Sequence, residues 1–415
     1  MSSPSTSPGD RVRAHRKARG LSQSDLAAQS GLSATTVKFI ENGKRSLTLS
    51  AAQKLAPALR IDDLAELFGP QVGTLPMTGR LTHPSIPAVR RALTNWSLTV
   101  TGEPQSVDYL RAMVDTAWTT WHTSQSQRTE VGEVLPALLE ELQRAARLHT
   151  GPERRKVLAL LAQAYHQAQA YLAWHGDQEL VWLSADRGMS SALEADDPVT
   201  IAGSVWYSAH LLRATGRTDE AVERLREAVD LIGPLVEAGP RDGSPARVAD
   251  HTETVAMLAD LHLCAALTRA RAGDQAAWAE WGKAHRIVTT MLPEGYAHPW
   301  TKVGTVRTEV YGVMCAVELG DTASATRLAD PLDPAAIHST EHRARHLLEL
   351  ARLADLEGSR EGVLHLLGQA AHVSAEVVSF SPVGRDMVRR AVETAPAYLR
   401  ASAVALAGKV AIVLD

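Results

Sequence analysis

The sequence predicts an all-α protein, in which a small five-helix domain at the N-terminus precedes a long array of helical hairpins. Two observations favour this fold class. Apolar residues recur at helical spacing in the first 68 residues, and from residue 87 onward helical patterning continues with no convincing strand. The 415 residues exceed one ordinary domain. We therefore expect a disordered tail at 1–8, domains at 9–70 and 87–415, and a linker at 71–86 rich in glycine and proline.

The most specific pattern lies in residues 20–45. Leu26 and Ala27 can face a core from one short helix, and Val37 and Ile40 from the next. Gly31 stands between them, where a tight turn needs a positive φ. Ser22 and Ser33 occupy the expected N-cap positions of the two helices. The pattern predicts two short helices joined at a steep angle by a glycine turn.

This stretch resembles the phage-repressor/Cro-like (XRE-type) helix-turn-helix of bacterial transcription regulators. The resemblance rests on the run Leu21-Ser22-Gln23, Leu26-Ala27, Gly31-Leu32-Ser33, Val37 and Ile40-Glu41-Asn42-Gly43-Lys44-Arg45. It implies that the second helix enters a DNA major groove. It also implies these DNA-binding residues: Arg13, Lys17, Gln23, Ser33, Ala34, Thr35, Thr36, Lys38, Phe39, Asn42, Lys44 and Arg45.

The chemistry of these side chains suits different parts of DNA. Thr35, Thr36 and Lys38 can reach base edges or phosphates, and Lys44 and Arg45 can hold the phosphate backbone. An aromatic ring at position 39 suits a thymine methyl, although packing within or between domains is the alternative for Phe39. Basic residues in the helix expected at 9–19, including Arg13 and Lys17, either contact phosphate or form a solvated face.

The charge distribution agrees with a DNA-binding N-terminus. The whole chain has a net charge of −4, which by itself argues against nucleic acid. Residues 1–68, however, hold 10 Lys and Arg against 6 Asp and Glu, whereas residues 69–415 hold 33 against 41. A basic N-terminus on an acidic body is typical of a DNA-binding domain joined to one that does not contact DNA.

Five loops after residue 87 share one pattern, an apolar helix followed by glycine and a polar turn. Their glycines are at 176, 216, 273, 320 and 358, a spacing that indicates stacked helical hairpins. The best copy, residues 212–232, resembles a tetratricopeptide repeat, and the whole array then resembles an α-solenoid. We expect an exposed loop at 233–250 and a terminal cap at 376–415, with a buried helix at 404–414. The architecture resembles a class of actinobacterial regulators and, more loosely, peptide-sensing quorum regulators.

The body carries no recognisable catalytic pattern, so we expect no enzyme and no cofactor. His338, His342 and His346 have a spacing that aligns them on one helix face, where they could hold a metal. A groove surface is the stronger interpretation, and we expect no metal. Two cysteines, Cys264 and Cys315, make no disulfide framework and suit a reducing cytoplasm. No signal peptide and no apolar run of about 18 residues is evident.

Aromatic and polar side chains on the hairpin helices are candidates for an effector pocket. Tryptophans usually serve as core, but as a set some can line a pocket, and the aromatic segment 295–300 could act as a lid. The candidate ligand-binding residues are Tyr165, His166, Gln169, Trp206, Tyr207, His210, Arg213, His262, Arg269, Trp300, Arg307 and Tyr311. The repeats contain no asparagine, which weakens a peptide ligand relative to a small molecule.

Taken together, these patterns predict a cytoplasmic, homodimeric transcription regulator that binds a double-stranded DNA operator. Its helical body dimerises and senses a small-molecule or peptide effector, which shifts the population of DNA-binding arrangements. The alternative is a regulatory scaffold whose body binds a protein partner.

Overall fold

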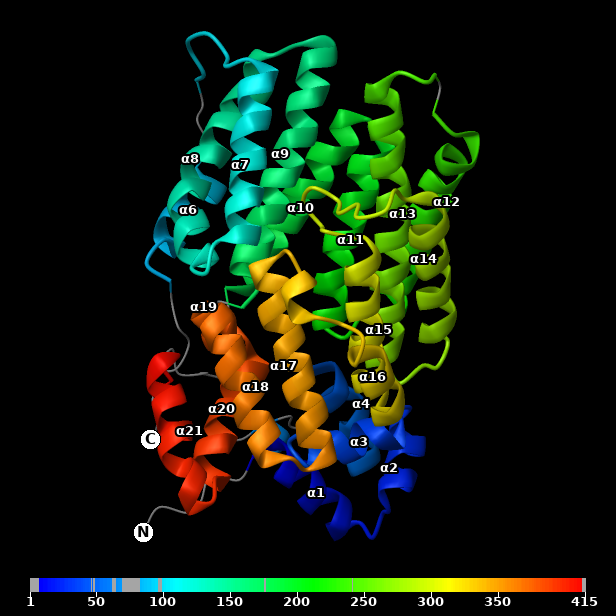
Figure 1. Ribbon diagram of the computed structural model, residues 1–415, viewed down its shortest axis with the longest axis vertical. Helices are drawn as coiled ribbons and strands as arrows, with labels where there is room; N and C mark the ends of the chain where they lie inside the picture. The colour runs from blue at the N-terminus through cyan, green and yellow to red at the C-terminus, as the bar shows by residue number, and fades with distance from the viewer. Residues whose placement is uncertain are drawn as a thin grey trace.

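A computed structural model describes residues 7–45, 47, 49–61, 65–68, 83–95, 99–174, 177–240 and 242–412. All regular secondary structure in these residues is helical, which confirms the predicted all-α class. Figure 1 shows a small N-terminal domain, here called the head, lying against one end of a larger helical body.

The head has its own small core. Its helices are α1 (Pro8–Ala18), α2 (Gln23–Ser30), α3 (Ala34–Glu41), α4 (Leu49–Leu59) and α5 (Ala65–Phe68). Val12, Leu26, Val37, Ile40 and Leu55 are almost wholly buried together, as the helical spacing predicts. Ser7 caps α1, so the helix begins at Pro8, inside the predicted tail. The rest of that tail, residues 1–6, lies outside the described residues.

Local sequence explains the sharp junction between α2 and α3. Ser22 and Asp25 form a capping box at the start of α2. Gly31 ends that helix at φ +66°, in the left-handed region that an L side chain rarely adopts. Ser33 then caps α3 by accepting a hydrogen bond from the Thr36 N–H. The predicted caps and turn are therefore present.

The body is an array of helical hairpins. It opens with α6 (Ile86–Thr94), so a helix begins at the predicted end of the linker; residues 71–82 lie outside the described part. In the part described, six hairpins follow: α7 (Val107–Thr123) with α8 (Gln127–Leu148), α9 (Gly151–Leu172) with α10 (Gln178–Ala195), α11 (Pro198–Ala214) with α12 (Thr218–Ala238), α13 (Pro245–Arg271) with α14 (Ala277–Met291), α15 (Thr305–Leu319) with α16 (Thr322–Ala329), and α17 (Thr340–Glu357) with α18 (Arg360–Val373).

The first helices of the hairpins form an inner layer that closes on itself. Helices α7, α9, α11, α13, α15 and α17 contact one another in succession, and α17 also contacts α7. At that closure the His122 ring nitrogen Nδ1 lies 2.9 Å from the Ser339 hydroxyl, and Thr340 donates to the carbonyl of Thr123. The inner helices therefore surround a common interior.

Four of the five predicted glycine turns join hairpin helices. Gly216, Gly273, Gly320 and Gly358 all have positive φ, between +74° and +82°. The fifth glycine, Gly176, lies outside the described residues. The hairpin prediction is confirmed at these four turns.

The predicted exposed loop at 233–250 is wrong. Helix α12 continues through Gly233 and Pro234 to Ala238, and α13 begins at Pro245. Buried Ile232 and Val236 explain this, because they continue the apolar face of α12 past the glycine. Packing of that face outweighs the local tendency of Gly-Pro to break a helix.

The C-terminal segment caps the array beside α18. It consists of α19 (Ala375–Phe380), α20 (Pro382–Thr394) and α21 (Ala397–Lys409), and a short 3₁₀ turn, η1 (Pro334–Ala336), precedes α17. The apolar run at 404–414 is helical only to Lys409, and residues 413–415 are outside the described part. Among described residues, no helix is long and apolar enough to cross a membrane.

Candidate nucleic-acid interface and body interior

Helix α3 divides its side chains between the head core and the outside. Val37 and Ile40 are buried in the head. Ala34 and Lys38 are exposed, as a DNA-reading face requires, and Asn42 is exposed just after the helix. Thr36, expected on the same exposed face, is buried instead.

A buried carboxylate fixes α3 against α1 and α2. Glu41 accepts from Arg16 at 2.5 and 2.9 Å and from the Gln23 amide at 2.9 Å. Burial alone would raise the pKa of Glu41, but these hydrogen bonds and the nearby guanidinium charges lower it. The carboxylate thus stays ionised and positions the helix. Gln23, a predicted DNA contact, is engaged within the head in this form.

Other predicted phosphate-binding side chains lie around this centre. Arg13 donates to the backbone carbonyl of Glu41 and, at 2.6 Å, to the side-chain oxygen of Asn42. Lys17 is exposed on α1. The Arg16–Glu41 pair was not predicted from the sequence. The available signal was Glu41 itself, an acidic residue directly after Phe39 and Ile40 at the end of α3.

This arrangement of α1 to α4 can be compared with known proteins. Residues 12–63 match a helix-turn-helix family model. The match spans most of the head and supports the predicted resemblance to XRE-type regulators. No curated protein matches the chain. The tetratricopeptide and actinobacterial resemblances of the body stay predictions.

The helix-turn-helix meets the body at two glycine turns. A Cβ atom added to Gly320 would lie 2.9 Å from Thr35 Cγ2 and 3.1 Å from Phe39 Cζ. One added to Gly273 would lie 2.7 Å from the Ser33 hydroxyl. Phe39 is buried at this contact. In this structure it therefore packs between the domains and is not open to a thymine methyl.

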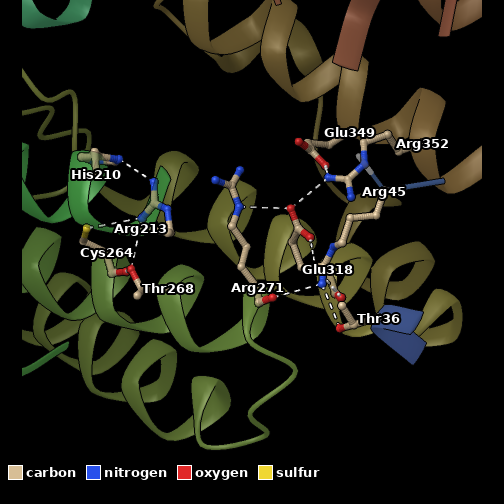
Figure 2. A network of polar contacts seen from close by, with 10 residues as sticks. All are labelled: Thr36, Arg45, His210, Arg213, Cys264, Thr268, Arg271, Glu318, Glu349 and Arg352. Atoms are coloured by element: carbon tan, nitrogen blue, oxygen red, sulfur yellow. Dashed lines mark hydrogen bonds and ion pairs between the residues drawn. The ribbon is translucent and has the colours of Figure 1, made fainter. Parts of the chain in front are cut away.

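Lys44 and Arg45 also bind the body. The Lys44 ammonium donates to the carbonyl of Asp355 at 2.7 Å, and Arg45 donates to the carbonyl of Arg271 at 3.0 Å. Arg45 also forms an ion pair with Glu318, shown in Figure 2. Two predicted phosphate-binding residues therefore have body acceptors as partners.

Most of the candidate ligand-binding residues meet in the interior of the body. Tyr207 stacks on His166 with ring centroids 4.6 Å apart, and lies nearly parallel to Trp300 at 6.1 Å. Gln169 donates to the carbonyl of Tyr207, and Trp206 packs against His210. These side chains come from α9, α11 and the segment before α15, so the closed inner layer brings them together.

Arginines border this aromatic cluster. Arg213 donates to the Thr268 hydroxyl at 3.1 Å and to His210 at 2.5 Å, as Figure 2 shows. Arg307 contacts the His342 ring and donates to the Tyr311 hydroxyl at 3.3 Å. The interior therefore combines flat aromatic surfaces with fixed positive charge.

Three candidates lie elsewhere. Tyr165 of α9 accepts from Gln143 of α8, so it faces the outer helix of the preceding hairpin. His262 pairs with Glu280 of α14 at 2.7 Å, and Arg269 pairs with Asp274 in the turn. Helical spacing alone could not separate the two faces of these helices, because both are buried.

Sequence reasoning missed several interior groups. His122 and His298 are buried beside Trp118 and Trp300, and burial lowers the pKa of each imidazole to about 3. Asp260 is also fully buried, which raises its pKa to about 6 against the opposing effects of Arg307, Thr301 and Trp206. A single carboxylate within the apolar run 255–267 was the signal available for Asp260.

One further expectation needs correction. His338 precedes α17 and is exposed, so the three histidines do not share one helix face; within the described residues no cluster of His, Cys, Asp or Glu could hold a metal. The segment 295–300, the candidate lid, contributes side chains to the interior. His298 and Trp300 are buried, and the absent side chain of Gly203 leaves room for the Trp300 ring.

Proposed function

We propose that this protein is a DNA-binding transcription regulator of the cytoplasm, and not an enzyme. The helix-turn-helix match to residues 12–63 carries the proposal. Helix α3 would lie in the major groove, with Lys38 and Thr35 directed at bases or nearby phosphates. Arg13, Lys17, Lys44 and Arg45 would hold the phosphate backbone and set the orientation of the head.

Binding to duplex DNA over a salt series tests this function. A labelled random-sequence duplex suffices, since phosphate contacts do not depend on sequence. The Lys38 side chain is exposed and has no hydrogen-bond or ion-pair partner among the described residues, so Lys38→Ala should weaken binding and reduce the salt slope by about one. Lys54→Ala, which alters an exposed lysine of α4, is the matched control and should leave the slope unchanged. Absence of salt-dependent binding even when the head is released from its contact with the body would contradict the function.

We further propose that the body dimerises and that its interior recognises an effector. Unpaired buried polar atoms support the second statement. Within the described residues, no hydrogen-bond partner satisfies His166 Nδ1, Gln169 Oε1, His210 Nε2 or Arg307 Nε. Buried polar groups are almost always hydrogen-bonded, so this concentration favours a site completed by another molecule. The aromatic faces and arginines suit a small polar molecule or a short peptide with an anionic group.

A thermal-shift screen of metabolites and short peptides tests effector recognition, because a ligand that binds the folded state raises its melting temperature. Its effect should disappear in Arg307→Gln and persist in Arg224→Gln, which alters an exposed arginine of α12. Stoichiometric capture of a protein by the body, without any small-molecule shift, would favour the scaffold alternative. Sedimentation analysis of the full chain tests the dimer.

A further inference from the structure

Three inner-helix ends of the body converge on the helix-turn-helix. Helix α13 ends at Arg271, α15 at Leu319 and α17 at Glu357. The turns that follow these helices contain Gly273, Gly320 and Gly358. Figure 1 shows the head lying against this end of the body.

The acceptors at these helix ends carry negative charge. Carbonyls of Arg271, Glu318 and Asp355 belong to the last turns of α13, α15 and α17, and all three accept from Arg45 or Lys44. A helix C-terminus carries about half a negative elementary charge. Three such ends, together with the Glu318 carboxylate, therefore resemble the closely spaced phosphates that Lys44 and Arg45 would otherwise bind.

Glu318 is the centre of this acceptor group. Its side chain is buried, and its pKa lies well below the ordinary range: burial would raise it, but the charges of Arg352, Arg45 and Arg271 lower it strongly. Arg352 also pairs with Glu349 at 2.6 Å. Figure 2 shows how the single carboxylate holds the guanidinium of the head together with two from the body.

The same contact covers the DNA-reading face. Thr35 and Phe39 abut Gly320, and Ser33 abuts Gly273, at distances that leave no room for a methyl group, while Thr36 lies in van der Waals reach of Gly273. A major-groove helix needs this face open to base edges. DNA and the body therefore cannot occupy α3 at the same time.

We propose that the body is an intramolecular inhibitor of the head, in which Glu318 and three helix C-termini take the place of DNA phosphates. This inference rests on the proposed DNA-binding function and adds its regulation. The undocked head binds DNA, so the apparent affinity is reduced by the fraction of molecules that are docked. Any ligand that binds the undocked form better would activate the protein.

The placement of the docking residues connects the contact with the body interior. Helix α13 carries Thr268, which binds Arg213 at the interior cluster, and one turn later Arg271, which binds Glu318. A shift of α13 on filling the interior would therefore reach the acceptor group directly.

Glycine substitutions test the inhibition without altering any residue assigned to DNA. Gly320→Ala and Gly273→Ala place a methyl group against α3, whereas Gly358→Ala changes a turn glycine of similar φ that has no neighbour within 4 Å. Each adds the same left-handed strain, but only the first two oppose docking. Affinity for a labelled random-sequence duplex of about three helical turns should rise at least about tenfold in these two and stay at the parent value in Gly358→Ala.

A second variant checks the charge mimicry. Glu318→Gln leaves three arginines around a neutral amide, so the head should undock and DNA affinity should rise as in the glycine variants. Far-ultraviolet circular dichroism and melting curves confirm that each variant is folded. Equal affinity in the parent, Gly273→Ala and Gly320→Ala would overturn the inhibition while leaving DNA binding intact. Failure of every variant to bind the duplex would overturn the DNA-binding function, and the inhibition with it.

Discussion

Arg45 of the head and Glu318 of the body form an ion pair inside the contact between the two domains, with side-chain exposures of 14% and 6%. The pair joins residues far apart in sequence, and it uses an arginine that the helix-turn-helix pattern assigns to DNA phosphate. Because Arg45 has one guanidinium, it cannot pair with Glu318 and bind a DNA phosphate at the same time. This relationship links the DNA-binding face to the state of the body.

Glu41→Gln should destabilise the head. The substitution removes the charge that compensates Arg16, which is largely buried beside it. Breaking a buried pair by removing one partner costs about 3 kcal/mol. We expect a lower melting temperature and weaker DNA binding.

The matched control is Glu66→Gln, an exposed head carboxylate that lies 3.9 Å from His15. It should change stability by less than about 0.5 kcal/mol, since exposed pairs contribute little. Equal melting temperatures for Glu41→Gln and the parent chain would show that the buried pair does not hold α3 in place.

Gly203→Ala should disturb the body interior. The added methyl would lie 2.8 Å from the Trp300 ring, which is packed against Tyr207. Overpacking of this kind costs about 1–3 kcal/mol. Urea unfolding followed by tryptophan fluorescence should show a reduced midpoint.

Gly282→Ala is the opposite case within the same body. This glycine lies inside α14 with nothing within 4 Å of an added Cβ. Alanine there should stabilise the protein by about 0.5–1 kcal/mol, because glycine is the poorer helix former. A lower unfolding midpoint for Gly282→Ala, or an unchanged one for Gly203→Ala, would contradict the surroundings described for these two glycines.

Stability should fall as the pH falls from about 6.5 towards 3. Burial lowers the pKa of His122, His166 and His298 to about 3, whereas an unfolded histidine titrates near 6.5. Between these values the unfolded chain binds more protons than the native protein, so acid favours unfolding. Burial raises the pKa of Asp260 to about 6, so this residue binds a proton more readily in the native protein and stabilises it as the pH falls below 6. One such carboxyl offsets only part of the effect of three histidines.

Replacement of one histidine should isolate this effect. In His166→Gln the slope of unfolding free energy against pH should decrease by up to about 1.4 kcal/mol per pH unit around pH 5. Urea unfolding at several pH values measures the slope. The corresponding change at exposed His338, His338→Gln, should leave it as in the parent chain. If both variants had the parent's slope, His166 would not be buried in its neutral form.

Local sequence was sufficient for the head. Ser22, Gly31 and Ser33 fix caps and a turn through interactions within a few residues, and the apolar positions Leu26, Val37 and Ile40 define one core face. The same holds for the hairpin turns, because Gly216, Gly320 and Gly358 need a positive φ that the sequence context indicates. Such features depend on neighbours in the chain, so a single sequence reveals them.

Features that depend on distant segments could not be predicted in this way. The exposed loop expected at 233–250 is largely helix, since burial of Ile232 and Val236 against the rest of the body outweighs Gly-Pro. Tyr165 and His262 face outer helices, a choice set by the closure of the inner layer. The role of Glu318 depends on arginines from the head and from two other inner helices. No residue near Glu318 in the sequence indicates that these side chains surround it.

Amide hydrogen exchange on the full chain, with and without saturating duplex DNA, tests the central claim most directly. DNA should remove the head from the body, so the turns at 271–274 and 318–321 should exchange faster although they do not contact DNA. Residues 148–151, between α8 and α9, serve as a reference and should be unaffected. Unchanged or slower exchange at both turns while DNA is bound would contradict competition between DNA and the body for the helix-turn-helix.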